Sequence, residues 1–140
     1  MKRMLLVGRS GAGKTTLSQS ILGKEIKYDK TQYISFKDFL IDTPGEYAEN
    51  HILGRALALY SYEADIIGLL LSATEPYSLY PPMVTACANR EVIGIITQTD
   101  KKDARVDLAR MWLEIAGCRK IFEVSSITGR GIKELFDYLK

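Results

Sequence analysis

The sequence has few residues of the kinds that hold small proteins together covalently or through metal ions. Its 140 residues include two cysteines, Cys87 and Cys118, and a single histidine, His51. The cysteines are far apart and form no Cys-x-x-Cys pair, so neither a disulfide scaffold nor a zinc module is expected. We expect both cysteines to pack as small apolar side chains.

Long apolar runs and a strong charge of one sign are also missing. The longest apolar run, residues 66–71, is far shorter than the roughly 20 residues that span a bilayer. The apolar run at residues 4–7 ends at Gly8 and is too short for an export signal, so we expect a cytoplasmic protein without membrane insertion. With 19 Lys and Arg against 17 Asp and Glu, the formal net charge is +2, which predicts no nucleic-acid partner.

What the sequence does contain is an alternation of two apolar patterns. Short apolar runs typical of strands occur at residues 4–7, 39–41, 66–71, 92–96 and 121–124, and a piece at 32–36 is expected to form a hairpin with 39–41. Helical spacing occurs at 14–22, 53–60, 108–115 and 132–139, and Pro81 or Pro82 can start a short helix through Cys87. The stripe in the third of these helices is Leu108, Met111, Trp112 and Ile115. This alternation predicts one α/β domain over residues 1–140, with a mostly parallel sheet covered on both faces.

A phosphate-binding loop is predicted between the first strand and the first helix. Gly8, Gly13, Lys14 and Thr15 occupy the fixed positions of G-x-x-x-x-G-K-[ST]. The glycines allow backbone N–H groups to turn toward a phosphate at a helix N-terminus. Lys14 is expected to contact the β- and γ-phosphates, and the Thr15 hydroxyl to bind Mg²⁺. The expected phosphate-binding set is Gly8, Gly11, Ala12, Gly13, Lys14, Thr15 and Thr16.

A second phosphate-sensing segment follows the strand at residues 39–41. Asp42 can hold Mg²⁺ through a water molecule, and the N–H of Gly45 can donate to the γ-phosphate. With the phosphate loop, this segment resembles the translation-factor-related class of small GTPases, in which D-x-x-G opens the second switch. Thr31 then matches the threonine of the first switch that closes over Mg²⁺; an ordinary strand-edge threonine is the alternative. The expected metal ligands are therefore Thr15, Thr31 and Asp42.

Glu46 stands where many such proteins place a glutamine that orients water. A carboxylate about 4 Å from a γ-phosphate charge is repelled by on the order of 4 kcal/mol at an effective dielectric constant near 20. Glu46 is therefore expected either to turn away until a partner binds or to act as a base only when protonation is shared, and intrinsic hydrolysis should be slower than about 1 per second. The expected catalytic residues are Lys14, Glu46 and Thr31. His51 is an alternative for positioning water, although a lone histidine at a helix start is more often structural.

The segment Thr97-Gln98-Thr99-Asp100 occupies the place of a guanine-reading N-K-x-D. The two carboxylate oxygens of Asp100 can accept the N1–H and N2–H of guanine, a donor pair that adenine lacks. Gln98 can lay its aliphatic stem over the base as lysine would. Thr97 stands in place of the asparagine of N-K-x-D. Because its side chain is shorter, we expect it to hold this segment less firmly to the phosphate loop and nucleotide affinity to be weaker.

Ser125, Ser126 and Ile127 begin a second base-recognition segment, followed by Thr128-Gly129-Arg130-Gly131. The segment resembles the S-A-x-x-G-x-G close of bacterial GTPases, whose backbone N–H groups contact O6 of guanine. Ser126 in place of alanine is a mild change, because that contact comes from the backbone.

Three stretches carry a resemblance to a named family: residues 42–47 with Glu49 and Asn50, residues 92–97, and residues 121–125. The chain resembles the ethanolamine-utilisation EutP / propanediol-utilisation PduV family over essentially its whole length. The resemblance implies a P-loop NTPase fold, a Ras-like three-layer sandwich, in a cytoplasmic protein associated with bacterial microcompartments. Gln98 departs from the lysine usual in this family.

Three functions remain open at this point. The leading hypothesis is a GTP- and Mg²⁺-binding switch or slow GTPase whose partner is a microcompartment shell protein or an activating protein. The second is a kinase that passes a phosphoryl group from ATP to acetate, an activity ascribed to some family members; Arg9, Lys30 or Arg55 could pair with the acid. The third is a non-catalytic adaptor that docks on shell proteins.

Overall fold

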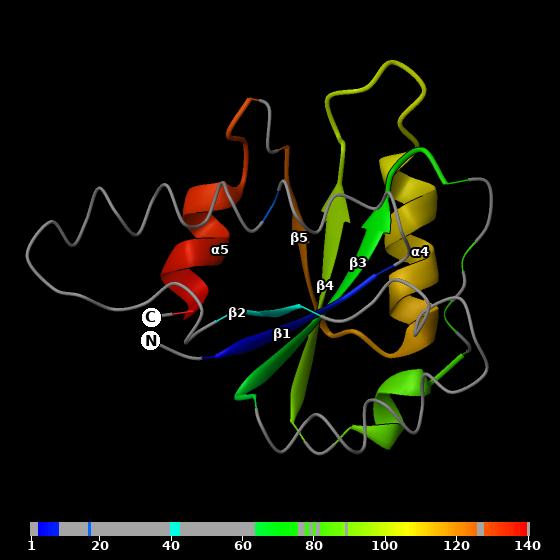
Figure 1. The fold of residues 1–140 in the computed structure, drawn as a ribbon. Coiled ribbons are helices and arrows are strands. Elements are labelled where there is room, and N and C mark those ends of the chain that lie inside the picture. Colours follow the sequence, from blue (N-terminus) through cyan, green and yellow to red (C-terminus); the bar gives the residue numbers. More distant parts are fainter. Residues whose placement is uncertain are drawn as a thin grey trace, which may run out of the picture.

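A computed structural model of the chain describes residues 3–8, 17, 40–42, 64–75, 78, 80, 82–88, 90–125 and 128–139, with the backbone alone at 40–42 and 87. The elements are β1 (Met4–Val7), β2 (Leu40–Asp42), β3 (Ile66–Ser72), the 3-10 helix η3 (Val84–Cys87), β4 (Glu91–Thr97), α4 (Val106–Ala116), β5 (Lys120–Glu123) and α5 (Ile132–Leu139). The strands form a five-stranded sheet in the order β2-β1-β3-β4-β5 (Figure 1). Every neighbouring pair is parallel, which confirms the predicted parallel sheet.

The central strands are continuous apolar runs because both faces of the sheet are covered. All seven residues of β3 are buried, as are six of the seven in β4. Successive side chains of a strand point to opposite faces. In β1, Leu5 and Val7 therefore join the apolar cluster on the α4 face, whereas Met4 and Leu6 join the cluster on the α5 face. The helices α4 and α5 thus form the outer layers of a three-layer α/β sandwich.

Most predicted elements are confirmed with boundaries shifted by one or two residues. The strand expected at 39–41 is β2, and the strand expected at 121–124 ends at Glu123. The short helix predicted after Pro81 or Pro82 is the single 3-10 turn η3. Leu17 is helical and buried in the cluster on the α5 face, as the predicted helix 14–22 requires. The rest of that helix, the strand at 32–36 with its hairpin, and the helix at 53–60 lie outside the described residues.

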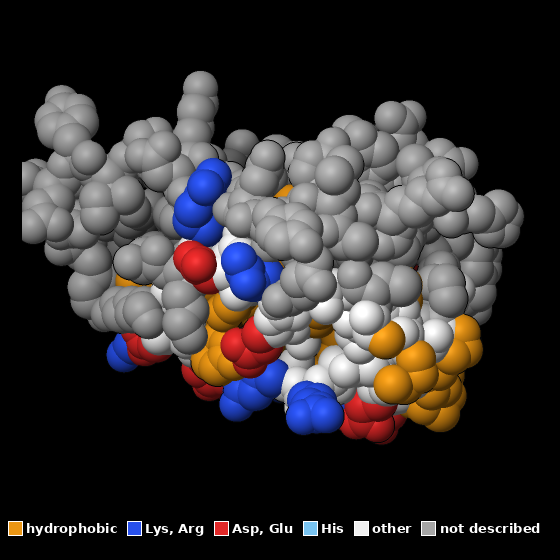
Figure 2. Space-filling model, turned by 90° about the horizontal axis from the view of Figure 1, so that it is seen from below, with side chains coloured by type: hydrophobic (Ala, Val, Ile, Leu, Met, Phe, Trp, Pro, Cys, Tyr) orange, Lys and Arg blue, Asp and Glu red, His pale blue; other side chains and the backbone are white. Residues whose placement is uncertain are grey.

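The stripe of Leu108, Met111, Trp112 and Ile115 predicted a helix correctly, but only part of the stripe lies against the core. Trp112 is partly buried and packs against the cluster on the α4 face. The buried residues of α4 are Ala109, Leu113 and Ala116. Met111 and Ile115 are each 46% exposed, and Met83, whose N–H donates to the carbonyl of Ile115, is 63% exposed. Figure 2 shows hydrophobic side chains gathered at the surface on the α4 side of the molecule.

Cys118 follows α4 and packs as a small apolar side chain, as expected. It is a free thiol in the cluster on the α4 face. Burial raises the pKa of the Cys118 thiol to about 12, so the reactive thiolate is scarce at neutral pH. Of the helices in the part of the chain that the structure describes, none has the length and apolar character needed to cross a membrane.

Candidate functional site

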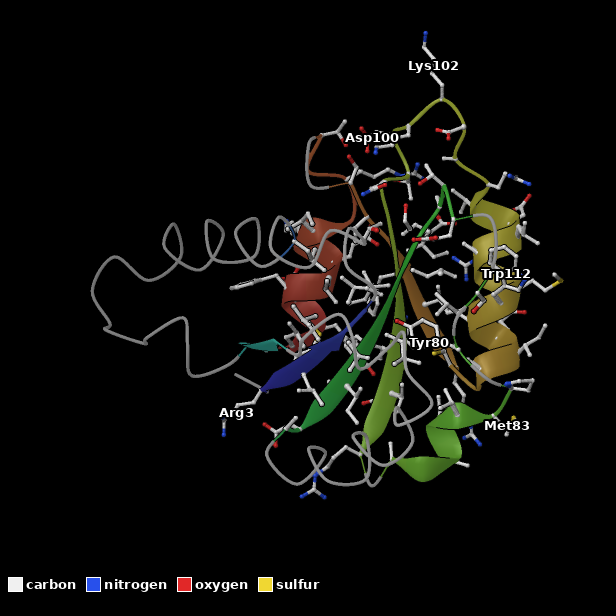
Figure 3. All side chains as sticks on the ribbon, turned by 45° about the vertical axis from the view of Figure 1, so that its right-hand side comes forward. Arg3, Tyr80, Met83, Asp100, Lys102 and Trp112 are labelled. Carbon is white, nitrogen blue, oxygen red and sulfur yellow. The ribbon has the colours of Figure 1, made fainter. Side chains whose placement is uncertain are left out.

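The parallel sheet brings several predicted site residues to one edge. The carboxyl ends of parallel strands lie together, and ligands of open α/β sheets bind outside those ends. Asp42 is the last residue of β2 and pairs with Leu6 of β1, so it lies beside the start of the predicted phosphate loop. In the next two strands, Ser72 pairs with Thr97. Figure 3 shows Asp100 at this edge and Arg3 at the opposite one.

The two predicted base-reading segments meet at a hydrogen bond. The Oγ of Ser125 donates to Oδ1 of Asp100 at 2.8 Å. Ser125 is fully buried, whereas Asp100 is exposed. A carboxylate has about four acceptor positions, and Ser125 occupies one of them. Asp100 is therefore fixed by a buried hydroxyl while it faces the open end of the sheet.

The turn that carries Asp100 is also tied to the strand β5. The backbone N–H of Thr99 lies 3.5 Å from the carbonyl oxygen of Val124, and the Thr99 hydroxyl donates to the same oxygen at 3.1 Å. Within the turn, the N–H of Lys101 donates to the carbonyl of Gln98 at 3.2 Å. Both ends of the turn are therefore held before any ligand arrives.

The second base-reading segment closes on itself through Ser125. The N–H of Ser125 donates to the carbonyl of Arg130 at 2.9 Å, and the N–H of Gly129 donates to the carbonyl of Ser125 at 2.8 Å. The N–H of Thr128 donates to the Ser125 hydroxyl at 3.2 Å. Gly131 has φ +76°, and a Cβ there would overlap the carbonyl oxygen of Glu123, so this position requires glycine. The loop is a compact support for Asp100.

Three supporting residues of this edge were missed by the sequence reasoning. Tyr80 is buried, and its hydroxyl donates to the carbonyl oxygens of Leu70 and Val7, at 2.6 and 3.1 Å, just before the predicted phosphate loop. Burial raises the pKa of Tyr80 well above its usual range, which keeps this donor protonated. Ser72 and Thr74 bind the side chain of Gln98. For Ser72 and Thr74, the signal in the sequence was that two hydroxyl residues come directly after the apolar run at 66–71.

Several expected site residues lie outside the described part of the chain. They are Gly11, Ala12, Gly13, Lys14, Thr15, Thr16, Thr31, Gly45, Glu46, Ser126 and Ile127, with Arg9, Lys30, His51 and Arg55 among the alternatives. The described members are Gly8, Thr97, Gln98, Asp100 and Ser125, with the backbone of Asp42. All of the described members lie at the carboxyl edge, so the structure brings together every expected residue whose place it describes.

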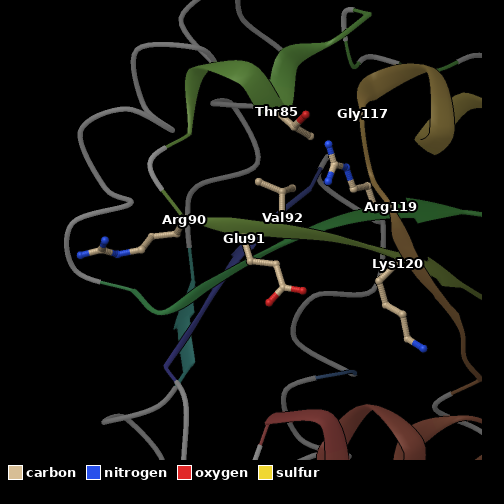
Figure 4. A pocket seen from close by; sticks show the side chains of 7 residues that line it. All are labelled: Thr85, Arg90, Glu91, Val92, Gly117, Arg119 and Lys120. Carbon is tan, nitrogen blue, oxygen red and sulfur yellow. The ribbon is translucent and has the colours of Figure 1, made fainter.

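A hollow of about 350 Å³ lies at the opposite edge, near the amino ends of β4 and β5. Arg90, Glu91, Arg119 and Lys120 are among the residues that line it. Figure 4 shows the side chains of Arg90 and Lys120 extending away from each other. Because these cations do not converge, we assign no ligand to the hollow.

Comparisons with known proteins agree with the architecture. The chain is 44% identical over 140 residues to the propanediol utilization protein PduV of Citrobacter freundii, covering 99% of this chain and 93% of that protein. It is 34% identical over 142 residues to a protein of Escherichia coli K12 named "Probable acetate kinase EutP", covering 99% and 89%. The GTPase Era of Mycobacterium tuberculosis is 28% identical over 160 residues, which cover 96% of this chain and 53% of Era.

A solved structure and a family model complete the comparison. Translation elongation factor SelB from Methanococcus maripaludis, in its apo form, superposes with a TM-score of 0.65 at 20% identity, covering 97% of this chain and 32% of SelB. This likeness supports the three-layer α/β fold. The model of the PduV-EutP family, described as "Ethanolamine utilisation - propanediol utilisation", matches residues 1–140. The chain therefore belongs to the PduV-EutP family.

Proposed function

We propose that the protein binds guanine nucleotides and acts as a slow GTPase in ethanolamine or propanediol utilisation. The observation that carries the proposal is the hydrogen bond between Ser125 and Asp100 at the carboxyl edge. It fixes an exposed carboxylate at the end of a parallel strand, where nucleotides bind in this class of fold. Two donors on one edge of guanine match the two oxygens of a carboxylate, and adenine has no such pair.

The names of the relatives support the pathway and the nucleotide. PduV is named for propanediol utilization, and Era is named a GTPase. For this chain both remain proposals, as do a cytoplasmic location near a microcompartment and a shell protein or activating protein as partner. GTP and GDP are the proposed nucleotides, with ATP as the alternative.

The proposed roles divide between binding and charge neutralisation. Gly8 and the residues that follow it would hold the phosphates through backbone N–H groups, with Lys14 as the positive charge. Thr15, Thr31 and Asp42 would hold Mg²⁺, which supplies further neutralisation of phosphate charge when bound. Asp42 lies at the end of β2 next to β1, and a carboxylate suits a hard cation. Glu46 would slow the reaction by repelling the γ-phosphate.

The test of the nucleotide is calorimetry of GDP and ADP binding in the presence of Mg²⁺. We expect preference for GDP, and Asp100→Asn should reduce GDP affinity by about 10-fold or more, because hydrogen bonds to a charged group are lost. The asparagine amide offers one acceptor and one donor, which match N1–H and O2 of xanthine. Affinity for xanthosine diphosphate should therefore rise in this variant.

Asp103→Asn is the matched control, because Asp103 is an exposed carboxylate three residues further along the same loop. It should change neither affinity. Equal binding of GDP and ADP by the wild-type protein would overturn the role of Asp100. Single-turnover GTP hydrolysis without a partner should be slower than about 1 per second, in line with intrinsic rates of small GTPases.

The competing function is suggested by the name of the Escherichia coli relative, which calls that protein a probable acetate kinase. In this reaction a carboxylate oxygen of acetate attacks the γ-phosphorus of ATP. The bond from that phosphorus to the β,γ-bridging oxygen breaks, and acetyl phosphate and ADP form. Acetate-dependent formation of acetyl phosphate, lost in Lys14→Ala, would favour the kinase over the GTPase.

A further inference from the structure

The side chain of Gln98 is held by two hydroxyls from the neighbouring strand. Its Oε1 accepts from the Oγ of Ser72 at 2.7 Å and from the Oγ1 of Thr74 at 3.4 Å. The two hydroxyl oxygens are themselves 2.8 Å apart. Ser72 is the last residue of β3 and Gln98 follows the last residue of β4, so the contact crosses between adjacent strands. The amide of Gln98 is therefore fixed at the carboxyl edge.

The hydrogen bonds among Ser72, Thr74 and Gln98 form a chain that ends on the side-chain oxygen of Gln98. The backbone N–H of Thr74 donates to the Oγ of Ser72 at 3.3 Å, and the hydroxyl of Ser72 then donates to Gln98. Ser72 is 2% exposed, so water has little access to this hydroxyl. Leaving the buried hydroxyl of Ser72 without a partner would cost free energy, so the geometry in which Ser72 binds Gln98 is favoured.

The backbone of Gln98 shows why such an anchor is needed. Its φ of 59° is in the left-handed region, which non-glycine residues adopt only when their surroundings enforce it. Beside it, the N–H of Ala73 donates to the carbonyl of Thr97 at 2.9 Å. The turn leading to Asp100 is thus held from the end of β3 through the bond of Ser72 to Gln98, and from the two residues that follow β5, Val124 and Ser125.

We propose that Ser72 and Thr74 are positioning residues for base recognition, acting through Gln98. The inference rests on the proposed guanine-nucleotide function. Glutamine stands here in place of the lysine of N-K-x-D, and it differs from lysine by having an acceptor oxygen. That oxygen is what the two hydroxyls bind, so the pair holds the stem of Gln98 and the following turn in the orientation that presents Asp100.

The chemistry of lysine makes the inference specific to this chain. A lysine ammonium has three donors and no acceptor, so it cannot accept from the hydroxyl of Ser72. In Gln98→Lys the hydroxyl of Ser72 can only accept from the ammonium, so the hydrogen bond that it donates to residue 98 is lost and the orientation of residue 98 should depend less on Ser72. Removing Ser72 should then matter more with glutamine at position 98 than with lysine.

The test is the ratio of the dissociation constants of ADP and GDP, measured by calorimetry for the full chain. Ser72→Ala and Gln98→Met, which keeps the aliphatic stem but removes the amide, should each lower this ratio about 3- to 10-fold, the effect of one neutral hydrogen bond. The double variant should lose no more than Gln98→Met alone, because Ser72→Ala removes a contact that Gln98→Met has already removed. Ser72→Ala should have a smaller effect on the ratio in the Gln98→Lys background than in the wild-type protein.

Thr85→Ala is the matched control, since it removes a half-buried hydroxyl at the opposite edge of the sheet, and it should leave the ratio unchanged. A loss of affinity for GDP and ADP by the same factor in Ser72→Ala would indicate a purely structural hydroxyl and overturn the inference. Additive effects in the double variant would overturn it too. If the wild-type protein binds neither GDP nor ADP, both the proposed function and the inference are wrong. If the wild-type protein prefers GDP but Ser72→Ala does not change the ratio, only the inference is wrong.

Discussion

The helices on the two faces of the sheet bury their side chains differently. On one face, α5 buries four large apolar residues, Ile132, Leu135, Phe136 and Leu139. On the other face, α4 buries two alanines and Leu113, and its large residues Met111 and Ile115 stay half exposed. Both helices are amphipathic, but α4 fully buries one large side chain, Leu113, and packs Trp112 against the core partly buried, whereas α5 fully buries four.

The difference follows from the surface that each helix meets. Against α4, the strand β4 presents Gly94, where a Cβ atom would lie 2.9 Å from Cδ1 of Leu113. The missing side chain makes room for Leu113, and the small Ala109 and Ala116 beside it let the helix approach closely. Met111 and Ile115 then remain on the outer side of α4, while Trp112 packs partly buried against the same cluster as Leu113. In α4, small residues face the sheet so that the helix can pack closely against it. The size of the apolar side chains therefore does not decide which face of this helix is buried.

The largest expected effect is on the α5 side. Phe136 is 2% exposed in the core, so Phe136→Ala should lower the free energy of unfolding by about 3–5 kcal/mol. Chemical denaturation monitored by circular dichroism measures this change. Lys133→Ala, an exposed position on the same helix, should change stability by less than about 0.5 kcal/mol. A loss below about 1 kcal/mol in Phe136→Ala would mean that α5 contributes little to the core.

The next effect tests the close approach of α4. Gly94→Ala places a methyl group against Leu113 and should cost about 1–3 kcal/mol through overpacking. Pairing it with Leu113→Val, which shortens the opposing side chain, should recover part of the loss. If Gly94→Ala is neutral on its own in thermal and chemical unfolding, the helix has freedom to move outward and the proposed reason for its small buried residues is wrong.

A smaller, pH-dependent effect is expected where α5 meets β4. The hydroxyl of Tyr138 donates to Oε1 of Glu91, and this bond, helped by partial burial, raises the pKa of Tyr138 to about 12. A raised pKa favours the protonated phenol in the folded state. The contribution to stability is thus complete below about pH 10, the unfolded value, and is lost as the pH rises to about 12.

Tyr138→Phe removes this contribution, so the two proteins should differ in stability below about pH 10 and converge as the pH rises to about 12. The ammonium of Lys120, 5.9 Å from the ring centroid of Tyr138, should remain in both. Unfolding of both proteins across this pH range, with the tyrosinate absorbance as a second signal, measures the effect. A difference that grows with pH would have the wrong sign for the hydrogen bond to Glu91.

The sequence predicts the fold well where apolar pattern and topology agree. The runs at 66–71 and 92–96 were predicted as buried strands, and the alternation with helices implied parallel pairing. For α4 the pattern was ambiguous, because alanines form a second apolar stripe beside the larger one. Which stripe enters the core depends on Gly94, a residue of a neighbouring element, and periodicity within the helix contains no such information.

The candidate site also has parts that the sequence predicts and parts that it does not. Asp100 and Ser125 could be placed at one edge, because each follows a strand of the same parallel sheet, but their hydrogen bond was not predicted. The link from Ser72 to Gln98 could not be predicted, since it requires knowing that β3 and β4 are neighbours in register. The hydrogen bond from Tyr80 to Val7 joins residues that are 73 positions apart in the sequence, so it could not be predicted either.

The smallest expected effect is on the outer side of α4. Met111→Gln and Ile115→Gln should each change the free energy of unfolding by less than about 0.5 kcal/mol, because half-exposed side chains lose little contact. Leu113→Gln is the matched change on the buried face, and it should be destabilising by several-fold more, since it places an amide in the core. Parallel urea unfolding curves compare the three variants. If Met111→Gln destabilises as strongly as Leu113→Gln, then the large residues of α4 are packed in solution, and the contrast between the two helices disappears.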